Sequence, residues 1–304
     1  MTYIYHLAGE NLELAEAELE GFLKSQNIQE QPERKNKLAF TQKHPSQLKR
    51  LALTHEVAEK ITETDYKTLD ITYTPEKSYS VRTVQIKGKN DSERIQRQLG
   101  ENLSSEENHV DLESPEKEIK AYLFEDSVVL GRVIEDIDRG LYQQRANQNR
   151  PFSSPVSLDP VLARTLVNLS EVSAGEKILD PFCGTGGILI EAGLCGVMPV
   201  GADAKQEMIK GTRQNLEEYG IMNHEINQEK IRDQGFEGAD AVVTDLPYGK
   251  ASKMEGEPVK QFLEKIEDFE GKTVFMYNEP ELGGYEADYE IYVHKSLTRY
   301  VYKL

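Results

Sequence analysis

A glycine-rich turn between two apolar segments is the part of this sequence best suited to hold a ligand. In LDPFCGTGGILIEA, residues 179–192, Asp180 ends an apolar run and an apolar helical pattern follows the turn. Glycines at positions 184, 186 and 187 permit positive φ and let a ligand approach the backbone closely. The helix that follows begins with free N–H groups, which can bind a carboxylate or a phosphate. The spacing therefore predicts a ligand site at this turn.

Two known phosphate-binding motifs fit this turn poorly. A dinucleotide fingerprint would need its third glycine at Leu189, and a P-loop would need Gly-Lys-Ser or Gly-Lys-Thr after the turn. Asp203 ends the next predicted strand and could accept hydrogen bonds from ribose hydroxyls. Asp180 precedes the turn, and Asp203 ends the next strand. These two acids favour a particular kind of ligand, a nucleoside with a positively charged or amino-bearing tail.

A second motif, TDLPYGK at residues 244–250, places a carboxylate and an aromatic ring after an apolar run. Residues 239–245 are predicted to form a strand, which begins with the apolar run 239–243 and ends at Asp245. Pro and Gly are turn residues, and Asp and Tyr often accompany them, so an ordinary turn is one interpretation. The position after a buried strand, in the same predicted domain as the glycine-rich turn, favours a functional interpretation.

Regular alternation of strands and helices predicts the elements that hold both motifs, as a parallel sheet with right-handed crossovers. The predicted strands are 177–180, 200–203 and 239–245, and the predicted helices are 158–169, 186–195 and 205–219. The last stretch, YEIYVHKSLTRYVYKL, is predicted to form a closing antiparallel pair.

The N-terminal half has a different, mixed pattern. A strand is predicted at 3–7, and then a helix in which apolar residues recur every three or four positions from Leu12 to Leu23. A strand near 37–41 and a helix near 45–59 are predicted next. SYSVRTVQIKG alternates as a strand, NDSERIQRQLGENL is typical of a helix, and further strands follow up to 134. DRGLYQQRANQNRPFSS, residues 138–154, lacks periodicity and is predicted to be a linker.

The net charge of −17 argues at first against a nucleic-acid partner. The two halves differ, because residues 1–150 hold 21 basic and 27 acidic residues, whereas residues 151–304 hold 15 and 26. The less acidic half also contains a locally basic stretch, so the overall acidity does not exclude a nucleic-acid partner. The basic residues of this stretch are Arg82, Lys87, Lys89, Arg94 and Arg97.

Other features make several classes of protein improbable. Apolar runs are too short to cross a bilayer, so no membrane partner is expected. The N-terminus lacks the features of a signal peptide, so the chain is expected to be cytoplasmic. Cys183 and Cys195 are too few for a disulfide framework or a four-ligand zinc site, and the histidines show no ligand spacing, so no metal is expected.

Taken together, DPFCGTGGILIEA, VGADAKQEMIKGTRQNLEEYG and ADAVVTDLPYG resemble a class I S-adenosylmethionine-dependent methyltransferase with an Asp/Asn-Pro-Pro-Tyr turn. RPFSSPVSLDPVLARTLVNLS is similar to the archaeal and eukaryotic tRNA guanosine-10 N2-methyltransferases. The unit at 78–134 resembles a THUMP domain, an RNA-binding module. The resemblance implies an α/β fold, with a Rossmann-like methyltransferase sheet after an α+β region. The implied domains are ferredoxin-like at 1–66, THUMP at 67–137, a linker at 138–155 and a methyltransferase domain at 156–304.

The resemblance also implies a cofactor, S-adenosyl-L-methionine, and residues that bind it. These residues are Asp180, Pro181, Gly184, Thr185, Gly186, Gly187, Asp203, Ala204 and Asp245. In the family an acidic residue near the adenine tends to follow the third strand of the sheet. Here HEINQEKIRD offers Asn227, Gln228 or Glu229 for that place, and the sequence leaves the choice open.

The turn at 245–248 is implied to hold the target base. Asp245 and the backbone carbonyl of Leu246 would accept the two N–H groups of guanine N2, and Asp245 could also take the released proton. Tyr248 would stack on a base rotated out of its helix, and Pro247 completes the turn. Leu246 stands where the family usually has proline, which removes a φ constraint of roughly 0.4–1 kcal/mol. This substitution predicts a less rigid turn.

The implied substrate is tRNA, with guanosine 10 the predicted site and mono- or dimethylation left open. Lys87, Lys89, Arg94 and Arg97 could hold phosphates or form an ordinary solvated face. Arg145 and Arg150 could contact RNA or pin the linker to the catalytic domain. A small zinc-binding activator subunit is a further partner that the resemblance suggests, whereas the RNA-binding unit favours RNA over DNA.

Two alternatives stay open at this point. One is a methyltransferase for another RNA amino group, either guanine N2 elsewhere or adenine N6. The other is a non-catalytic RNA-binding protein that retains the fold.

Overall fold

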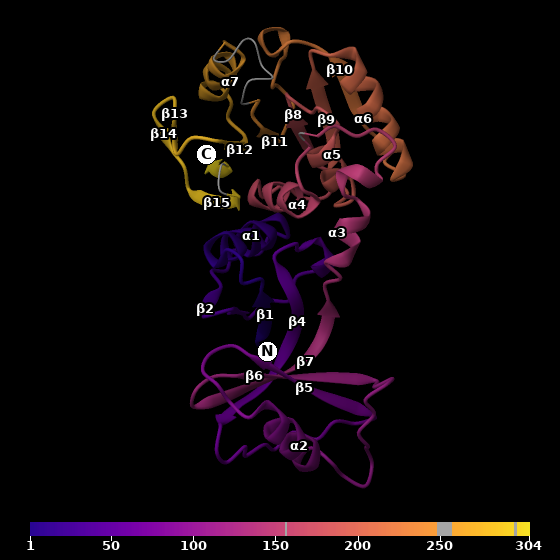
Figure 1. The fold of residues 1–304 in the computed structure, drawn as a ribbon, viewed down its shortest axis with the longest axis vertical. Helices are drawn as coiled ribbons and strands as arrows, with labels where there is room; N and C mark the ends of the chain where they lie inside the picture. The colour runs from indigo at the N-terminus through magenta and orange to yellow at the C-terminus, as the bar shows by residue number, and fades with distance from the viewer. Residues whose placement is uncertain (156, 248–256, 295–296) are drawn as a thin grey trace. The chain divides into compact units, whose positions relative to one another are not determined.

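The computed structural model describes residues 1–155, 157–247, 257–294 and 297–304 (Figure 1). Its contacts divide the chain into two compact units. The N-unit comprises Met1–Leu12, Glu30–Lys49 and Thr54–Ile137, and the C-unit comprises Glu13–Gln29, Arg50–Leu53 and Asp138–Leu304. The first predicted helix and the predicted linker therefore belong to the C-unit. The predicted boundaries of the ferredoxin-like, THUMP and methyltransferase domains stay a prediction.

The N-unit contains a seven-stranded sheet in the order β2-β3-β1-β4-β7-β6-β5, in which only β5 and β6 pair in parallel. Its strands are β1 (Tyr3–Leu7), β2 (Glu33–Lys35), β3 (Leu38–Thr41), β4 (Thr54–Asp65), β5 (Tyr79–Gln85), β6 (Lys117–Leu123) and β7 (Ser127–Asp136). Strands from both predicted N-terminal domains thus share one sheet.

Helix α2 (Ser92–Asn102) covers part of this sheet. The side chain of Asp91 caps the helix by accepting from the backbone N–H of Arg94 at 3.0 Å. Ile95 and Leu99 are buried against Tyr79 and its neighbours on the sheet. The predicted helix in this region is therefore confirmed, and its amphipathic pattern is what fixes it to the sheet.

One predicted element of the N-unit is wrong. The stretch from 45 to 59 was predicted as a helix, but it contains a short 3-10 turn (Leu48–Arg50) and the start of β4. Its Ala, Glu and Lys residues favour a helix locally. Pairing with β1 on one side and β7 on the other outweighs that preference, and Val57 and Ala58 are fully buried there.

The C-unit contains a second seven-stranded sheet, in the order β10-β9-β8-β11-β12-β16-β15 (Figure 1). The first five strands in that order are parallel, and β12, β16 and β15 pair antiparallel. The strands are β8 (Lys177–Asp180), β9 (Met198–Asp203), β10 (Glu225–Gln228), β11 (Ala241–Asp245), β12 (Lys272–Tyr277), β15 (Tyr289–His294) and β16 (Leu297–Lys303). This is the predicted Rossmann-like sheet with its closing antiparallel pair.

Helices and short elements complete the C-unit. The helices are α1 (Leu12–Ser25), α3 (Gly140–Gln144), α4 (Pro160–Leu169), α5 (Gly187–Gly193), α6 (Gln206–Glu218) and α7 (Glu257–Glu267). The shorter elements are the 3-10 turns Asn147–Asn149 and Ile231–Asp233 and a small hairpin of β13 (Glu281–Leu282) and β14 (Tyr285–Glu286). The sheet and these helices together carry both sequence motifs.

Buried polar groups attach α1 to α4 within the C-unit. Glu18 accepts from the backbone N–H groups of Ala52 and Leu53, each at 2.8 Å, and from the side chain of Asn168 at 2.7 Å. Gly21 permits this close approach, because a Cβ there would lie 2.2 Å from the Asn168 carbonyl oxygen. Any larger residue at position 21 would push the two helices apart.

Candidate active site

The glycine-rich turn joins β8 to α5 as the sequence predicts. Gly184 and Gly186 have positive φ, at 51° and 80°. A Cβ on Gly186 would also lie 2.8 Å from Cγ2 of Thr212 on α6, so both backbone angle and space require glycine here. The Thr212 hydroxyl donates to the Gly184 carbonyl at 2.7 Å, which fixes the turn against α6.

The other predicted cofactor residues of the turn are held by neighbouring segments. The Pro181 carbonyl accepts from the side chain of Gln234 at 3.1 Å. The Thr185 hydroxyl shares a 2.6 Å hydrogen bond with Ser157, and its carbonyl accepts from Asn215 at 2.9 Å. The turn is therefore fixed from several sides, as a preformed binding site requires.

Asp180 is buried at the carboxyl end of β8. Its Oδ1 accepts from the Thr244 hydroxyl at 2.7 Å and from the Phe182 backbone N–H at 3.1 Å. Burial raises the pKa of Asp180 to about 7, the charges of Asp245 and Asp203 add to the rise, and the two hydrogen bonds oppose it. A buried carboxyl that titrates near neutrality is typical of functional sites.

Asp203 ends β9 and contacts the glycine-rich turn directly. Its Oδ2 accepts from the Gly184 N–H at 3.3 Å, and its Oδ1 accepts from the Lys205 N–H at 2.8 Å. Burial raises the pKa of this carboxyl, and the two backbone donors lower it. The structure therefore brings Asp203 and the turn together, as expected for a ligand that spans both.

The segment after β10 lies beside Asp203. Gln228 pairs with Asp203 in register, and its side chain donates to the Ala204 carbonyl at 3.2 Å. Glu229 is the first residue beyond the strand, and its backbone N–H donates to the Asp203 carbonyl at 3.1 Å. Asn227 lies one position further inside the strand. Of the three residues left open by the sequence, Glu229 is the one placed beyond the carboxyl end of the sheet.

Asp245 ends β11, between β8 and β12 in the sheet. Its side chain is 17% exposed, and Oδ2 accepts from Nη1 of Arg299 on β16 at 2.7 Å. Its Oδ1 is buried and has no hydrogen-bond partner among the residues that the structure describes. Burial raises the pKa of Asp245, whereas the Arg299 charge and hydrogen bond lower it.

Sequence reasoning missed Arg299. It lies 54 residues after Asp245, and only the order of the strands brings the two together. One signal was available, because Arg299 alternates with Val301 in the apolar stretch LTRYVYKL, and a charged residue at a buried strand position usually has a partner.

Leu246 and Pro247 continue the chain from Asp245. The Leu246 side chain is only 1% exposed and packs in a cluster that includes Phe262 and Phe275. Its backbone N–H donates to the Met276 carbonyl at 3.0 Å, a bond that a proline could not make. Tyr248, the predicted stacking residue, lies outside the described residues.

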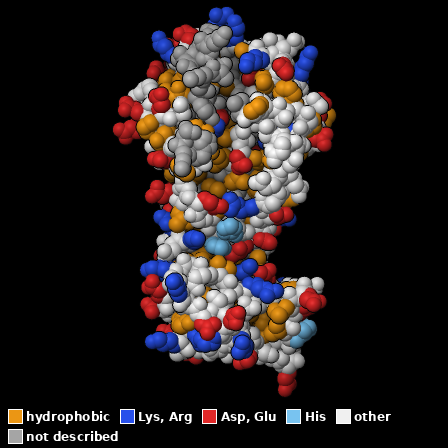
Figure 2. Space-filling model, in the orientation of Figure 1, with side chains coloured by type: hydrophobic (Ala, Val, Ile, Leu, Met, Phe, Trp, Pro, Cys, Tyr) orange, Lys and Arg blue, Asp and Glu red, His pale blue; other side chains and the backbone are white. Residues whose placement is uncertain are grey.

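The predicted RNA-binding residues fall into two groups. Lys87, Lys89, Arg94 and Arg97 are all exposed in the N-unit. Figure 2 shows basic and acidic side chains intermixed on the face that it presents. RNA binding by these four residues stays a prediction.

The two linker arginines lie in the C-unit. Arg145 holds both carboxylate oxygens of Glu191 on α5, at 2.7 and 3.1 Å. Arg150 is buried, and its Nε donates to the Arg145 carbonyl. Its guanidinium also lies close to Gly187, because a Cβ added to this glycine would be 3.2 Å from Nη1 of Arg150. These contacts favour the second alternative from the sequence, in which both residues pin the linker to the catalytic domain.

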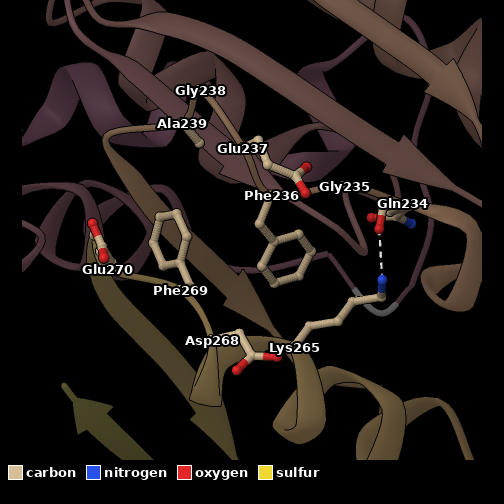
Figure 3. Close-up of a pocket in the computed structure, with 11 residues that line it drawn as sticks. Gln234, Gly235, Phe236, Glu237, Gly238, Ala239, Lys265, Asp268, Phe269 and Glu270 are labelled. Atoms are coloured by element: carbon tan, nitrogen blue, oxygen red, sulfur yellow. Dashed lines mark hydrogen bonds between the residues drawn. The ribbon is translucent and has the colours of Figure 1, made fainter.

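A cavity of about 500 Å³ lies elsewhere in the C-unit (Figure 3). It is lined by residues just before β11 and β12, including Phe236 and Phe269, whose rings are 6.0 Å apart and edge to face. Lys265 donates to the Gln234 carbonyl at its rim. The cavity therefore lies at the amino ends of these strands, whereas ligands of such sheets bind at the carboxyl ends.

Among the residues that the structure describes, no group of three or more His, Cys, Asp or Glu side chains could hold a metal ion. No helix within that same part of the chain is long and apolar enough to cross a membrane.

Comparisons with known proteins agree with this geometry. Residues 147–269 match the family described as UPF0020: RMKL-like, methyltransferase domain. The tRNA (guanine(10)-N2)-dimethyltransferase of Methanothermobacter thermautotrophicus is 40% identical over 229 residues, which cover 72% of this chain and 68% of that protein. This chain belongs to the tRNA (guanine(10)-N2)-dimethyltransferase family.

Further comparisons support membership of the tRNA (guanine(10)-N2)-dimethyltransferase family. The relative from Methanocaldococcus jannaschii is 35% identical over 246 residues, covering 74% of this chain and 70% of that protein. The crystal structure of TrmN from Thermus thermophilus has the same fold, with a TM-score of 0.59 at 18% identity, and covers 100% of this chain and 99% of that one. The predicted fold and family are confirmed. As a member of this family the chain is a methyltransferase, and its cofactor is S-adenosyl-L-methionine.

Proposed function

We propose that this chain methylates the exocyclic N2 of guanosine 10 in tRNA and proceeds to N2,N2-dimethylguanosine. The relationship to the dimethyltransferases supports the substrate and the product. The observation that carries the proposal is the group of three acids, Asp180, Asp203 and Asp245, at the carboxyl ends of neighbouring parallel strands. That arrangement suits a cationic nucleoside on one side and an amino group on the other.

The residues present fit the cofactor. The glycine-rich turn leaves space that a Cβ would fill, and the N-terminus of α5 follows it. Asp203 would accept from the ribose hydroxyls, Asp180 would face the positively charged methionine part, and Glu229 would lie near the adenine. Bound there, S-adenosylmethionine supplies an electrophilic methyl group on a sulfonium.

Asp245 and Leu246 would then orient the target amino group. The lone pair of guanine N2 is delocalised into the ring, so acceptors facing its two N–H groups favour pyramidalisation and direct the lone pair at the methyl carbon. Oδ1 of Asp245, which has no hydrogen-bond partner in the described part of the chain, would supply one acceptor, and the Leu246 carbonyl would supply the other. Methylation leaves N2 with one proton to release, which Asp245 or water would accept.

The N-unit would bind the RNA. Its exposed residues Lys87, Lys89, Arg94 and Arg97 can contact phosphates, and Pro247 and Tyr248 would complete the binding of the base. The domain division predicted from the sequence, the cytoplasm as the site of action and a small zinc-binding activator subunit are further parts of this proposal.

Nucleoside analysis tests the proposal directly. Unmodified tRNA transcripts would be incubated with methyl-labelled S-adenosylmethionine, digested and separated. Label should enter N2-methylguanosine first and N2,N2-dimethylguanosine later, and a transcript with adenosine at position 10 should accept none. Label in m1G or m6A would contradict the reaction, and unchanged labelling of the position-10 variant would contradict the position.

A further inference from the structure

The strand β16 places an arginine beside the proposed catalytic carboxylate. The side chain of Arg299 is 10% exposed and that of Asp245 is 17% exposed, so the pair is largely shielded from water. Their 2.7 Å hydrogen bond joins Nη1 of Arg299 to Oδ2 of Asp245. Shielded pairs of this kind hold a more defined geometry than exposed ones.

Strand register explains how the two residues meet. Asp245 on β11 lies opposite Met276 on β12, and Met276 lies opposite Val301 on β16. Arg299 precedes Val301 by two positions and therefore points to the same face of the sheet. It lies just beyond the last β12–β16 pair, which joins Tyr277 and Tyr300. An arginine at this position can reach past the end of β12 to the carboxyl end of β11.

The two oxygens of Asp245 have different surroundings. Oδ2 is held by Arg299, while Oδ1 is buried without a hydrogen-bond partner among the described residues. A buried acceptor without a partner is costly and therefore uncommon in folded proteins. At the carboxyl end of a strand in an active site, such an atom is well placed to accept from a ligand.

We propose that Arg299 is a positioning residue for methyl transfer: it fixes Oδ2 of Asp245 so that Oδ1 accepts an N–H of the target amino group. This inference rests on the proposed function. The planar guanidinium suits the task because its donors are fixed in direction, whereas a lysine ammonium rotates freely.

Arg299 also favours the ionised form of Asp245. Burial raises the pKa of the Asp245 carboxyl, whereas the charge and the hydrogen bond of Arg299 lower it. Without the arginine, a larger share of Asp245 would be protonated at a given pH and would lose acceptor strength. The effect of losing Arg299 should therefore grow as the pH falls.

Single-turnover methylation of unmodified tRNA tests this role. With saturating S-adenosylmethionine, Arg299→Gln should lower the rate by about 100-fold, the typical cost of a small misplacement of reacting groups. The ratio of wild-type to variant rate should rise as the pH falls from 8 to 6. Titration of Asp180 changes the rates of wild type and of Arg299→Gln alike, so its effect largely cancels in the ratio of the two rates. Cofactor affinity measured by calorimetry should change by less than about threefold.

Lys303→Gln is a matched control on the same strand. Lys303 pairs with Glu171 at 2.8 Å, away from Asp245, so its loss removes one charge and one ion pair from β16 without touching the site. Its single-turnover rate should stay within about twofold of wild type at every pH.

Two further variants keep the test decisive. Arg299→Lys retains the charge and should show an intermediate rate, about tenfold below wild type, with the wild-type pH dependence. If Arg299→Gln fails to fold, the double variant Asp245→Asn/Arg299→Gln removes the unpaired buried charge and should recover the melting temperature. In that case an Arg299→Lys rate equal to wild type would overturn the inference.

The remaining outcomes separate the inference from the proposed function. An active wild type with an Arg299→Gln rate within threefold of it at every pH would refute the positioning role. A loss of the same size at every pH, accompanied by a lowered melting temperature, would mean a purely structural role. A wild-type protein that forms no N2-methylguanosine would instead refute the proposed function.

Discussion

Two acidic residues of the C-unit, the buried Glu191 and the partly buried Asp245, differ in how completely they are paired. Glu191 on α5 is fully buried, and both of its oxygens are bound, one by Arg145 and the other by Arg145 and Arg164 at 3.1 and 2.7 Å. Asp245 has one oxygen bound by Arg299 and the other without a described partner. The carboxylate of Glu191 thus belongs to a closed network, in which both oxygens are paired, and that of Asp245 to an open one, in which only one oxygen has a described partner.

The difference in pairing distinguishes a structural role for Glu191 from the functional role proposed for Asp245. The network of Glu191 joins the linker and α4 to α5, the helix that follows the glycine-rich turn, and it leaves no acceptor for a ligand. Asp245 lies at the carboxyl end of its strand, where an unused acceptor can be filled by substrate. Under the proposed function, incomplete pairing leaves Asp245 an acceptor for the substrate, whereas complete pairing gives Glu191 a role in the scaffold.

The largest effect is expected from Asp245→Ala. Removing the acceptor should lower turnover by about 10⁴-fold, the upper range for a group that orients and accepts a proton. Cofactor affinity by calorimetry should stay within about threefold. A matched control is Glu264→Ala, which removes an exposed carboxylate on α7. A large loss of cofactor affinity in Asp245→Ala would place this residue in the cofactor site instead.

Glu191→Ala should break the closed network. Arg145 and Arg164 would keep buried charges without their partner, at a cost of about 3–5 kcal/mol in the free energy of unfolding. Urea unfolding followed by circular dichroism measures this loss. If Glu191→Ala were instead as stable as wild type but inactive, the contrast drawn between the two acids would be wrong.

Leu246→Ala tests how the apolar packing beside Asp245 contributes to stability. Truncating this buried side chain should cost about 2–4 kcal/mol of unfolding free energy, since it leaves a cavity among aromatic rings. The variant keeps its backbone carbonyl, so turnover at a temperature where it is folded should fall far less than in Asp245→Ala. Equal losses of turnover would mean that the Leu246 side chain itself contacts the substrate.

The smallest effect concerns the pH dependence of cofactor binding. Asp180 has a pKa raised to about 7, mainly by burial, and a positively charged ligand favours its ionised form. Below pH 7 binding must also ionise Asp180, so affinity should fall about tenfold between pH 8 and pH 6. Asp180→Asn should bind more weakly at pH 8 and show little pH dependence. An identical slope in wild type and variant would exclude Asp180 as the titrating group.

Local patterns predicted the turn and the strand-end acids that are proposed to bind the cofactor. The glycine spacing, the apolar runs ended by Asp180, Asp203 and Asp245, and the strand–helix alternation are all short-range signals, and the C-unit sheet follows from them. The pair of Asp245 and Arg299 could not be predicted in the same way. It depends on the order and register of β11, β12 and β16, which a single sequence does not specify.

Other differences have the same origin. The stretch at 45–59 forms part of β4 because of pairing with strands distant in sequence, against its local preference. Helix α1 belongs to the C-unit because Glu18 and Gly21 meet Asn168, about 150 residues away. The sequence left open whether Arg145 and Arg150 contact RNA or pin the linker, because their contacts are also distant in sequence: Arg145 binds Glu191 on α5, and the Arg150 guanidinium lies close to Gly187 at the start of α5.

The hydrogen bond from the Leu246 N–H to the Met276 carbonyl changes what holds the proposed acceptor in place. A proline at this position would restrict the turn by its own ring, whatever the state of the rest of the protein. Here the restriction comes from β12 and from the surrounding apolar side chains, so it exists only while that part of the sheet is intact. When heating disrupts β12, the acceptor should lose its alignment, and methylation should decline together with the C-unit sheet.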